Sequence, residues 1–286
     1  MGVNQPLSVR QQLRAIGRAI LQAILKSLRG GSLLQAQAVA FNMFLAFFPA
    51  VVFLAGVLAY AEPGLEELLE GLRMVLPPGS RRAVVDSLLQ LSAKPGRLLL
   101  VGAIGTVLLG SQLMFSLTRI FAAISPAHNP RSFWDRQLRS LAMVFVAVIP
   151  WVAVSLLVLF GKFVRAWLIE EVGIWFDSSL QMLWTVGYFA LAVLTATLVL
   201  AALYHHLGPD RRQRWDEVLP GAALAMMLWW VVTSAFGYYV RRLAIYDFLY
   251  GGFAAAIGLL IWMYLSAVVV LIGEQFNAEM ASLRSG

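Results

Sequence analysis

Residues 246–281, YDFLYGGFAAAIGLLIWMYLSAVVVLIGEQFNAEMA, decide the fold of this chain. The segment 253–272 carries no charge. At a rise of about 1.5 Å per residue, a helix of this length crosses a hydrocarbon core about 30 Å thick. Further apolar stretches of similar length lie upstream, at residues 37–60, 98–120, 141–160, 180–203 and 219–240. The chain is therefore predicted to be an all-α polytopic membrane protein, a bundle of six transmembrane helices.

The composition supports a membrane protein and excludes several site classes. Of the 286 residues, 60% are hydrophobic and 13% are charged, whereas soluble domains have about a quarter of their residues charged. The absence of cysteine excludes disulfides and thiolate metal sites. The net charge of +7 is typical of basic residues kept at a cytoplasmic surface beside anionic lipid. We therefore expect anionic lipid headgroups as partners, and no nucleic acid.

The distribution of basic residues predicts the topology. Most of the 22 Lys and Arg residues fall before the first span, in the second and fourth loops, and at the C-terminus. Because cytoplasmic loops are enriched in Lys and Arg, this bias predicts that both termini are inside.

Two segments outside the spans have amphipathic patterns. In residues 1–30, Ile16, Ile20 and Ile24 recur at helical spacing beside several arginines, which predicts a basic helix lying in the membrane interface. Residues 31–286 form the six-helix domain. Within it, residues 61–97 alternate Glu and Leu before a Pro-Pro-Gly turn and carry a second short amphipathic pattern after it, which predicts a surface helical hairpin. Two roles for the hairpin remain open: cover for the helix ends, or a lid.

The C-terminal stretch resembles the YihY/BrkB-like membrane proteins, a family once labelled as ribonuclease BN. The resemblance rests on Tyr250-Gly251-Gly252, on the segment Leu260 to Ala267 (LIWMYLSA), and on the segment Gly273 to Ala278 (GEQFNA). The family tail is Gly-Ala-Glu-x-Asn-Ala, so its usual acid position holds Gln275 here, and an acid stands one residue earlier. The resemblance implies a six-span, multi-pass protein of the bacterial inner membrane. It implies no settled activity.

Polar and aromatic residues at membrane depth are the candidate substrate-binding residues, because each buried polar group costs free energy unless it is paired or hydrated. Asn42 and Gln112 are expected at similar depth on neighbouring helices. Pro49 interrupts the first span and predicts a kink. The kink serves packing in one interpretation and lines a cavity in the other. Trp262 and Tyr264 lie within the last span, where packing and a face that binds an amphiphile are the two alternatives.

A second group of polar residues is expected near the cytoplasmic boundary. Arg119 and Glu274 reach similar depth there, with Gln275 and Asn277 nearby. One hypothesis is an ion pair or gate between Arg119 and Glu274. The alternative is that Arg119 extends to lipid phosphate and Glu274 to water.

Enzymatic chemistry is not predicted. The sequence contains no glycine-rich phosphate loop, no Gly-x-Ser-x-Gly elbow and no acidic metal cluster. We therefore expect no catalytic residues, no metal and no cofactor. The predicted function is secondary or passive transport, such as flipping, of an amphiphilic or lipid-related substrate. The alternative is a non-transporting scaffold for envelope or lipid-handling partners. A homo-oligomer is compatible with so small a bundle.

Overall fold

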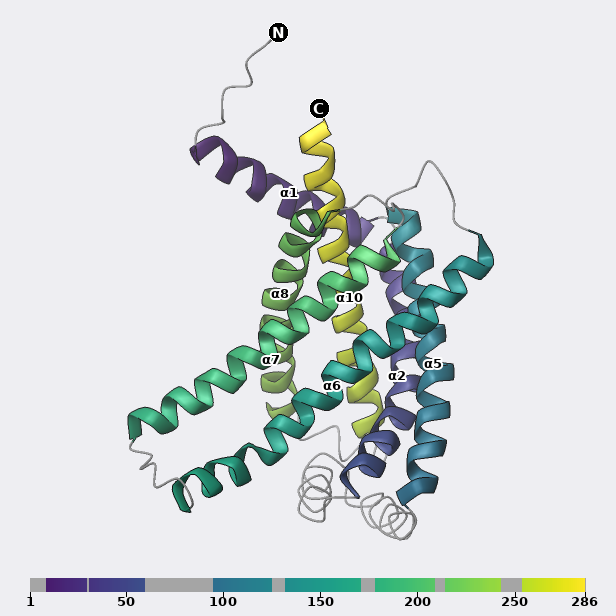
Figure 1. Cartoon of the computed structure of the whole chain (residues 1–286). Helices are drawn as coiled ribbons and strands as arrows, with labels where there is room; N and C mark the ends of the chain where they lie inside the picture. The colour runs from purple at the N-terminus through teal and green to yellow at the C-terminus, as the bar shows by residue number, and fades with distance from the viewer. Residues whose placement is uncertain are drawn as a thin grey trace.

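A computed structural model of the chain describes residues 9–29, 31–59, 95–124, 132–170, 178–208, 214–242 and 254–285. Within these ranges the helices are α1 (Val9–Arg29), α2 (Ser32–Leu58), α5 (Pro95–Ile124), α6 (Phe133–Glu170), α7 (Ser178–Leu207), α8 (Trp215–Arg242) and α10 (Ala254–Ser285) (Figure 1). The described residues contain no strand. The all-α prediction is confirmed.

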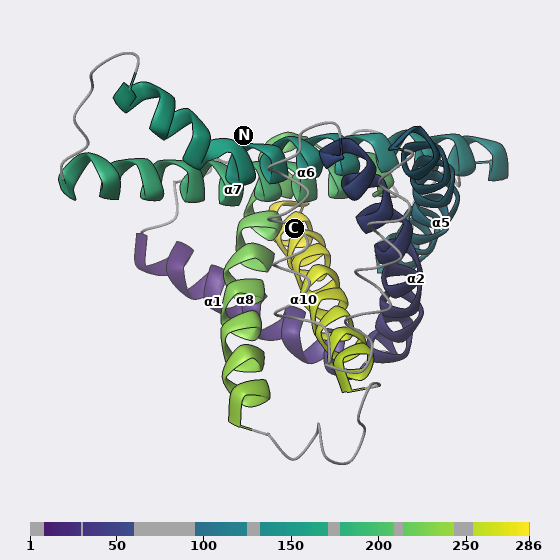
Figure 2. The same ribbon diagram turned by 90° about the horizontal axis from the view of Figure 1, so that it is seen from below.

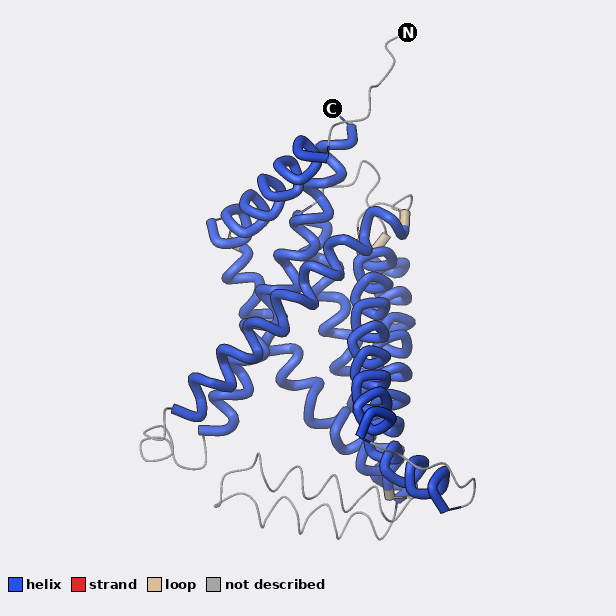
Figure 3. Tube along the Cα trace, turned by 90° about the vertical axis from the view of Figure 1, so that its left-hand side faces the viewer, coloured by secondary structure: helices blue, strands red, loops and turns tan. Residues whose placement is uncertain are grey.

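Six of these helices are long and apolar enough to cross a membrane. Their spanning segments are Ser32–Leu58, Pro95–Ile124, Phe133–Leu156, Phe189–Leu207, Trp215–Val240 and Ala256–Leu283. Each overlaps one predicted span, so the prediction of six spans is confirmed. Helix α1 and the last turns of α10 lie at the same end of the bundle (Figures 1 and 3), as an even number of spans requires. We refer to this end as the termini end and to the opposite end as the distal end.

Helix α1 packs against the bundle. Its small residues Ala19 and Ala23 are buried in a cluster with Leu224 of α8 and with Ile272 and Phe276 of α10. Small side chains allow this close approach between helices. The other side of α1 leaves apolar side chains exposed, among them Ile16, Leu21 and Leu25. The basic N-terminal helix therefore covers the termini end, and its placement in a membrane interface stays a prediction.

Helices α2 and α5 form the closest pair. A Cβ added at Gly102 would overlap the backbone of Phe53, and one added at Gly56 would overlap the backbone of Leu99. Gly105 faces the ring of Pro49 in the same way. Helix α2 runs on through Pro49, which favours the packing interpretation of this proline over a break that lines a cavity.

The packed core lies in the half of the bundle toward the termini end. Helices α2, α5, α6, α7, α8 and α10 all contribute to it, and at its centre the rings of Phe121 and Tyr204 meet edge to face at 5.5 Å between centroids. Its buried members are Ala36, Val39, Ala40, Met114, Leu117, Ile120, Phe121, Met143, Val144, Ala201, Leu203, Tyr204, Leu207, Val218, Ala222, Met263, Ala267 and Leu271. Toward the distal end, α6 and α7 incline away from α8 (Figures 1 and 2).

The predicted hairpin at 61–97 lies outside the described residues up to position 94. Residues 95–97 form the first turn of α5.

Candidate functional site

Helices α7, α8 and α10 meet at a buried polar cluster near the termini end, which we call the seam: Tyr204, Gly221, Gly273, Glu274 and Asn277. Tyr204 is fully buried, and the exposed fractions of Glu274 and Asn277 are 1% and 2%. The Tyr204 hydroxyl donates to the Val270 carbonyl at 2.7 Å, and the backbone N–H of Gly221 donates to Asn277 Oδ1 at 2.8 Å. Two hydrogen bonds thus join the three helices. One links α7 to α10, and the other links α8 to α10.

Two glycines allow the seam to close. A Cβ at Gly221 would overlap the side chain of Asn277 and the carbonyl of Gly273. A Cβ at Gly273 would overlap the Tyr204 hydroxyl and the carbonyl of Gly221. Helices α8 and α10 are therefore in backbone contact here, which brings the Asn277 amide within reach of the first turns of α8.

Hydrogen bonding in the seam is incomplete. Glu274 Oε2 and Asn277 Nδ2 are buried and have no hydrogen-bond partner. Among the described residues, no Lys, Arg or His forms an ion pair with Glu274. The Tyr204 hydroxyl is the titratable group that interacts with it electrostatically. A buried carboxyl without a cationic partner is rare in a membrane span and marks a candidate functional site.

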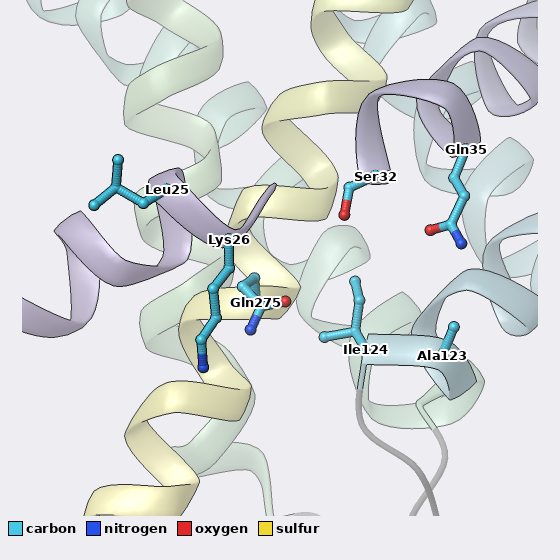
Figure 4. Close-up of a pocket in the computed structure, with 7 residues that line it drawn as sticks. All are labelled: Leu25, Lys26, Ser32, Gln35, Ala123, Ile124 and Gln275. Carbon is cyan, nitrogen blue, oxygen red and sulfur yellow. The ribbon is translucent and has the colours of Figure 1, made fainter. Parts of the chain in front are cut away.

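A pocket of ≈ 510 Å³ lies on another side of α10, between α1, α2 and α5 (Figure 4). It is lined by Leu25, Lys26, Ser32, Gln35, Ala123, Ile124 and Gln275. Lys26 Nζ forms an ion pair with Glu279 Oε1 at 2.5 Å, and Gln275 Nε2 donates to the same oxygen at 3.0 Å. Because the Lys26 side chain is 60% exposed, solvent screens this pair and it contributes little to stability.

Asn42 and Gln112 do not line a common cavity in the described structure. Asn42 Nδ2 donates to Ser116 Oγ at 2.7 Å, which ties α2 to α5. The Gln112 side chain is exposed, and neither residue lines the ≈ 510 Å³ pocket. Pro49 packs on α5. The depths were estimated from the sequence, but the directions in which the side chains point depend on helix rotation, which the sequence pattern does not specify.

The hypothesis of an Arg119–Glu274 ion pair is corrected by the structure. Arg119 is exposed, whereas Glu274 is buried in the seam, and no ion pair joins them in the described part of the chain. The alternative that Glu274 extends to water is wrong as well, because its carboxyl is inaccessible. Gln275 and Asn277 diverge too, since the first lines the pocket and the second lies in the seam.

The two aromatic candidates of the last span have contacts within the bundle. Trp262 Nε1 donates to Thr233 Oγ1 of α8 at 3.1 Å, and its ring lies edge to face with Trp229 at 6.0 Å. Tyr264 is partly buried against the core. These contacts account for both residues as packing between helices, and a role in binding an amphiphile stays a prediction.

The sequence interpretation did not single out Tyr204, Gly221 or Lys26. A tyrosine next to two histidines at a helix end looks like an interface residue, and a glycine just after Pro220 looks like part of a helix start. The sequence does contain one signal that could have identified this site. Gly221 and Gly273 are small residues at the termini end of two spans, and small residues mark close helix contacts.

The described residues contain no group of three or more His, Cys, Asp or Glu placed to hold a metal ion. His205 stacks on Trp215 with a centroid separation of 4.6 Å, so this histidine contributes to packing at the termini end.

The fold and the site define the class of protein: this is a polytopic α-helical membrane protein whose spans close around a buried carboxyl. Residues 25–285 match the family model described as virulence factor BrkB. The chain belongs to this family, and the resemblance noted in the C-terminal stretch is confirmed.

Three relatives illustrate what the chain is similar to. The chain is 27% identical over 241 residues to "Putative ribonuclease-like protein YfkH" of Bacillus subtilis, which covers 84% of this chain and 86% of that one. It is 28% identical over 253 residues to a UPF0761 membrane protein of Laribacter hongkongensis and 27% identical over 254 residues to one of an Azoarcus species. These alignments cover 86% of this chain but only 57% and 59% of the two relatives. No solved structure matches the chain.

Proposed function

We propose that this protein is a secondary or passive carrier of an amphiphilic or lipid-related substrate, without enzymatic activity, in the bacterial inner membrane with both termini inside. The observation that carries the proposal is the contrast between the two ends of the bundle. At the termini end, α7, α8 and α10 are packed through the seam, with Tyr204 and Ala222 fully buried. At the distal end the same helices present unpacked apolar surfaces.

Helix α7 displays this contrast most clearly. Between residues 182 and 198, none of its described side chains is buried, whereas residues 201–204 are all buried. Its exposed large apolar side chains lie on several faces of the helix: Met182, Leu183, Val186, Phe189, Leu191, Val193, Leu194 and Leu198. In a membrane, the exposed apolar side chains of such a helix contact acyl chains or a movable partner surface.

Helix α8 shows the same contrast, but its packed end is its N-terminal end because it runs antiparallel to α7. Its buried residues end at Ala225, and Met227, Trp230 and Val231 are exposed. The two antiparallel helices are packed at one end and diverge toward the other (Figure 1), where both expose apolar side chains. The apolar tail of an amphiphile can bury surface against side chains of this kind on either helix. A bundle that closes the distal end and opens the seam would face the other side of the membrane.

Anionic lipid headgroups are the partners that we propose at the termini end. Lys26 and Arg119 are exposed there, and basic side chains near an anionic surface each gain about 1 kcal/mol. A homo-oligomer, with α7 covered by a second copy, stays a prediction.

The test is reconstitution into liposomes with a fluorescent phospholipid scrambling assay and a panel of small-solute flux assays. The chain has no cysteine, so a double variant, Leu194→Cys with Met227→Cys, introduces the only two thiols. Both positions are exposed: Leu194 lies 13 residues before the last residue of α7, Leu207, and Met227 lies 12 residues after the first residue of α8, Trp215. A reducible cross-linker between them is expected to stop flux, and reduction is expected to restore it.

The two single-cysteine variants treated with the same reagent are the matched controls and are expected to retain flux. An absence of flux for every probe in the wild type, or flux that survives the cross-link, contradicts a carrier. The scaffold alternative is favoured by the first of these results.

A further inference from the structure

We infer that Glu274 is a proton-binding site whose protonation is linked to opening and closing of the seam, so that transport depends on the pH at the termini end. This inference rests on the proposed function for its coupling part, and on the seam geometry alone for proton binding. The packing of the seam does not require the carboxyl of Glu274, because a neutral side chain of similar size would fill the same volume.

Among the residues that the structure describes, no cationic side chain forms an ion pair with Glu274. Helix α7 contributes the hydroxyl of Tyr204, and this hydroxyl already donates to the Val270 carbonyl. Where α8 meets α10 next to this carboxyl, its residues Gly221 and Ala225 contact Gly273 and carry no charge. On α10 itself the side chain of Asn277, one turn on, interacts with the carboxyl but carries no charge.

The charged groups of the other elements packed against α10 are engaged elsewhere or turned away. Lys26 of α1 pairs with Glu279, and α2 contributes Ala36, Val39 and Ala40 to the core that it shares with α10. Arg119 of α5 is exposed. An ionised carboxylate without a partner in an apolar interior costs far more free energy than a protonated one, so the closed seam requires a proton on Glu274.

A bound metal cation suits the seam less well than a proton. Na⁺ and divalent cations need several oxygen ligands. Asn277 Oδ1 already accepts the Gly221 N–H, and the Tyr204 hydroxyl is directed to the Val270 carbonyl. Glu274 Oε2 is a single carboxyl oxygen with no hydrogen-bond partner. One such oxygen is enough to bind a proton, whereas a metal cation would need further ligands.

The coupling follows from the position of the carboxyl. Glu274 lies where α7 and α8 close on α10, so water reaches it only when these helices separate. In the open seam the carboxylic acid transfers its proton to water and becomes a carboxylate, with hydronium as the other product. The seam closes again only after the carboxylate has taken up a proton, because closure would otherwise bury an unpaired charge. Each opening releases one proton at the termini end and each closing takes one up from the same side, so closure of the seam depends on the pH at the termini end.

The first test measures protonation without any transport assay. Infrared spectroscopy of the purified protein at neutral pH is expected to show the stretching band of a protonated carboxyl. The band is expected to disappear in Glu274→Gln and to persist in the matched variant Glu217→Gln, whose carboxyl accepts a hydrogen bond from the Arg214 N–H at the start of α8. Absence of the band in the wild type overturns the inference. A band that appears only on removal of Na⁺ does so too, since it identifies a cation site.

A second variant moves the carboxyl without changing composition or net charge. Glu274→Gln combined with Gln275→Glu moves the acid out of the buried seam and into the pocket that Lys26 also lines. The protonated band is expected to vanish in this variant while the protein remains folded, and persistence of the band contradicts the assignment to Glu274.

The coupling part is tested in proteoliposomes with an imposed pH gradient. Flux of a fluorescent phospholipid through the wild type is expected to depend on the gradient, and flux through Glu274→Gln is expected to be independent of it. Equal gradient dependence in both overturns the coupling. If the band is present and the wild type shows no flux, proton binding stands, whereas the carrier proposal and the coupling that rests on it fail.

Discussion

The substitution Gly221→Ala tests the seam where its packing is tightest. The added Cβ would overlap the Asn277 side chain and the Gly273 carbonyl, so α8 and α10 must move apart. Overpacking of this kind costs about 1–3 kcal/mol. Displacement of Asn277 also breaks its bond to the Gly221 N–H, and leaving these buried groups unpaired costs about 1–3 kcal/mol. The better helix propensity of alanine offsets about 1 kcal/mol.

The expected net result is a loss of about 1–5 kcal/mol in the free energy of unfolding. The measurement is unfolding in mixed detergent micelles, followed by the fluorescence of the 9 tryptophans. The matched control is Gly187→Ala on α7, where an added Cβ meets nothing within 4 Å and stability is expected to be unchanged or slightly raised. Equal stability of the two variants would refute the close approach of α8 and α10.

Three further experiments separate packing from function. Asn42→Ala loses one hydrogen bond between α2 and α5, which lowers the free energy of unfolding by about 0.6 kcal/mol and is expected to leave phospholipid flux unchanged; a specific loss of flux at normal stability would return Asn42 to the site. Lys26→Ala removes an exposed partner of Glu279 and is expected to cost less than about 1 kcal/mol in the same unfolding measurement, so a larger loss would contradict the screening argument. A double-mutant cycle of Arg119→Ala with Glu274→Gln is expected to give a coupling energy below about 0.5 kcal/mol, and a larger value would reinstate the ion pair.

The spans were predictable because hydrophobic length is a property of the sequence alone. Residues 253–272 lie within the segment Ala256–Leu283 apart from their first three positions, and the other five predictions overlap their segments similarly. Gly102 and Gly105 of the second span contact α2, in keeping with the general rule that small residues mark close helix contacts. The separation of α7 from α8 was not predictable, because α7 is apolar on every face and its pattern does not distinguish a protein neighbour from lipid.

The site was predictable in depth but not in direction. Glu274, Gln275 and Asn277 were expected together at one end of the last span, and they do lie at that end. Their partners were misassigned, because on a helix that is apolar through most of its length no stripe indicates which face meets which neighbour. The partners are set by two glycines that allow α8 to approach, and a contact of that kind involves residues more than fifty positions apart.

The replacement of the family's acid by Gln275, with an acid one residue earlier, has a structural meaning once the two faces of α10 are distinguished. Successive residues of a helix point about 100° apart. Gln275 lies in the pocket near Lys26, where a carboxylate has a cation and solvent within reach. Glu274 lies in the seam, where it has neither. A shift by one position therefore moves a carboxyl from a face where it can be ionised to one where, when the seam is closed, it must carry a proton. An acid that served only to anchor α1 would have to face the pocket, so position 274 could not serve that role. An acid whose protonation changes when the seam opens has to lie in the seam, as Glu274 does.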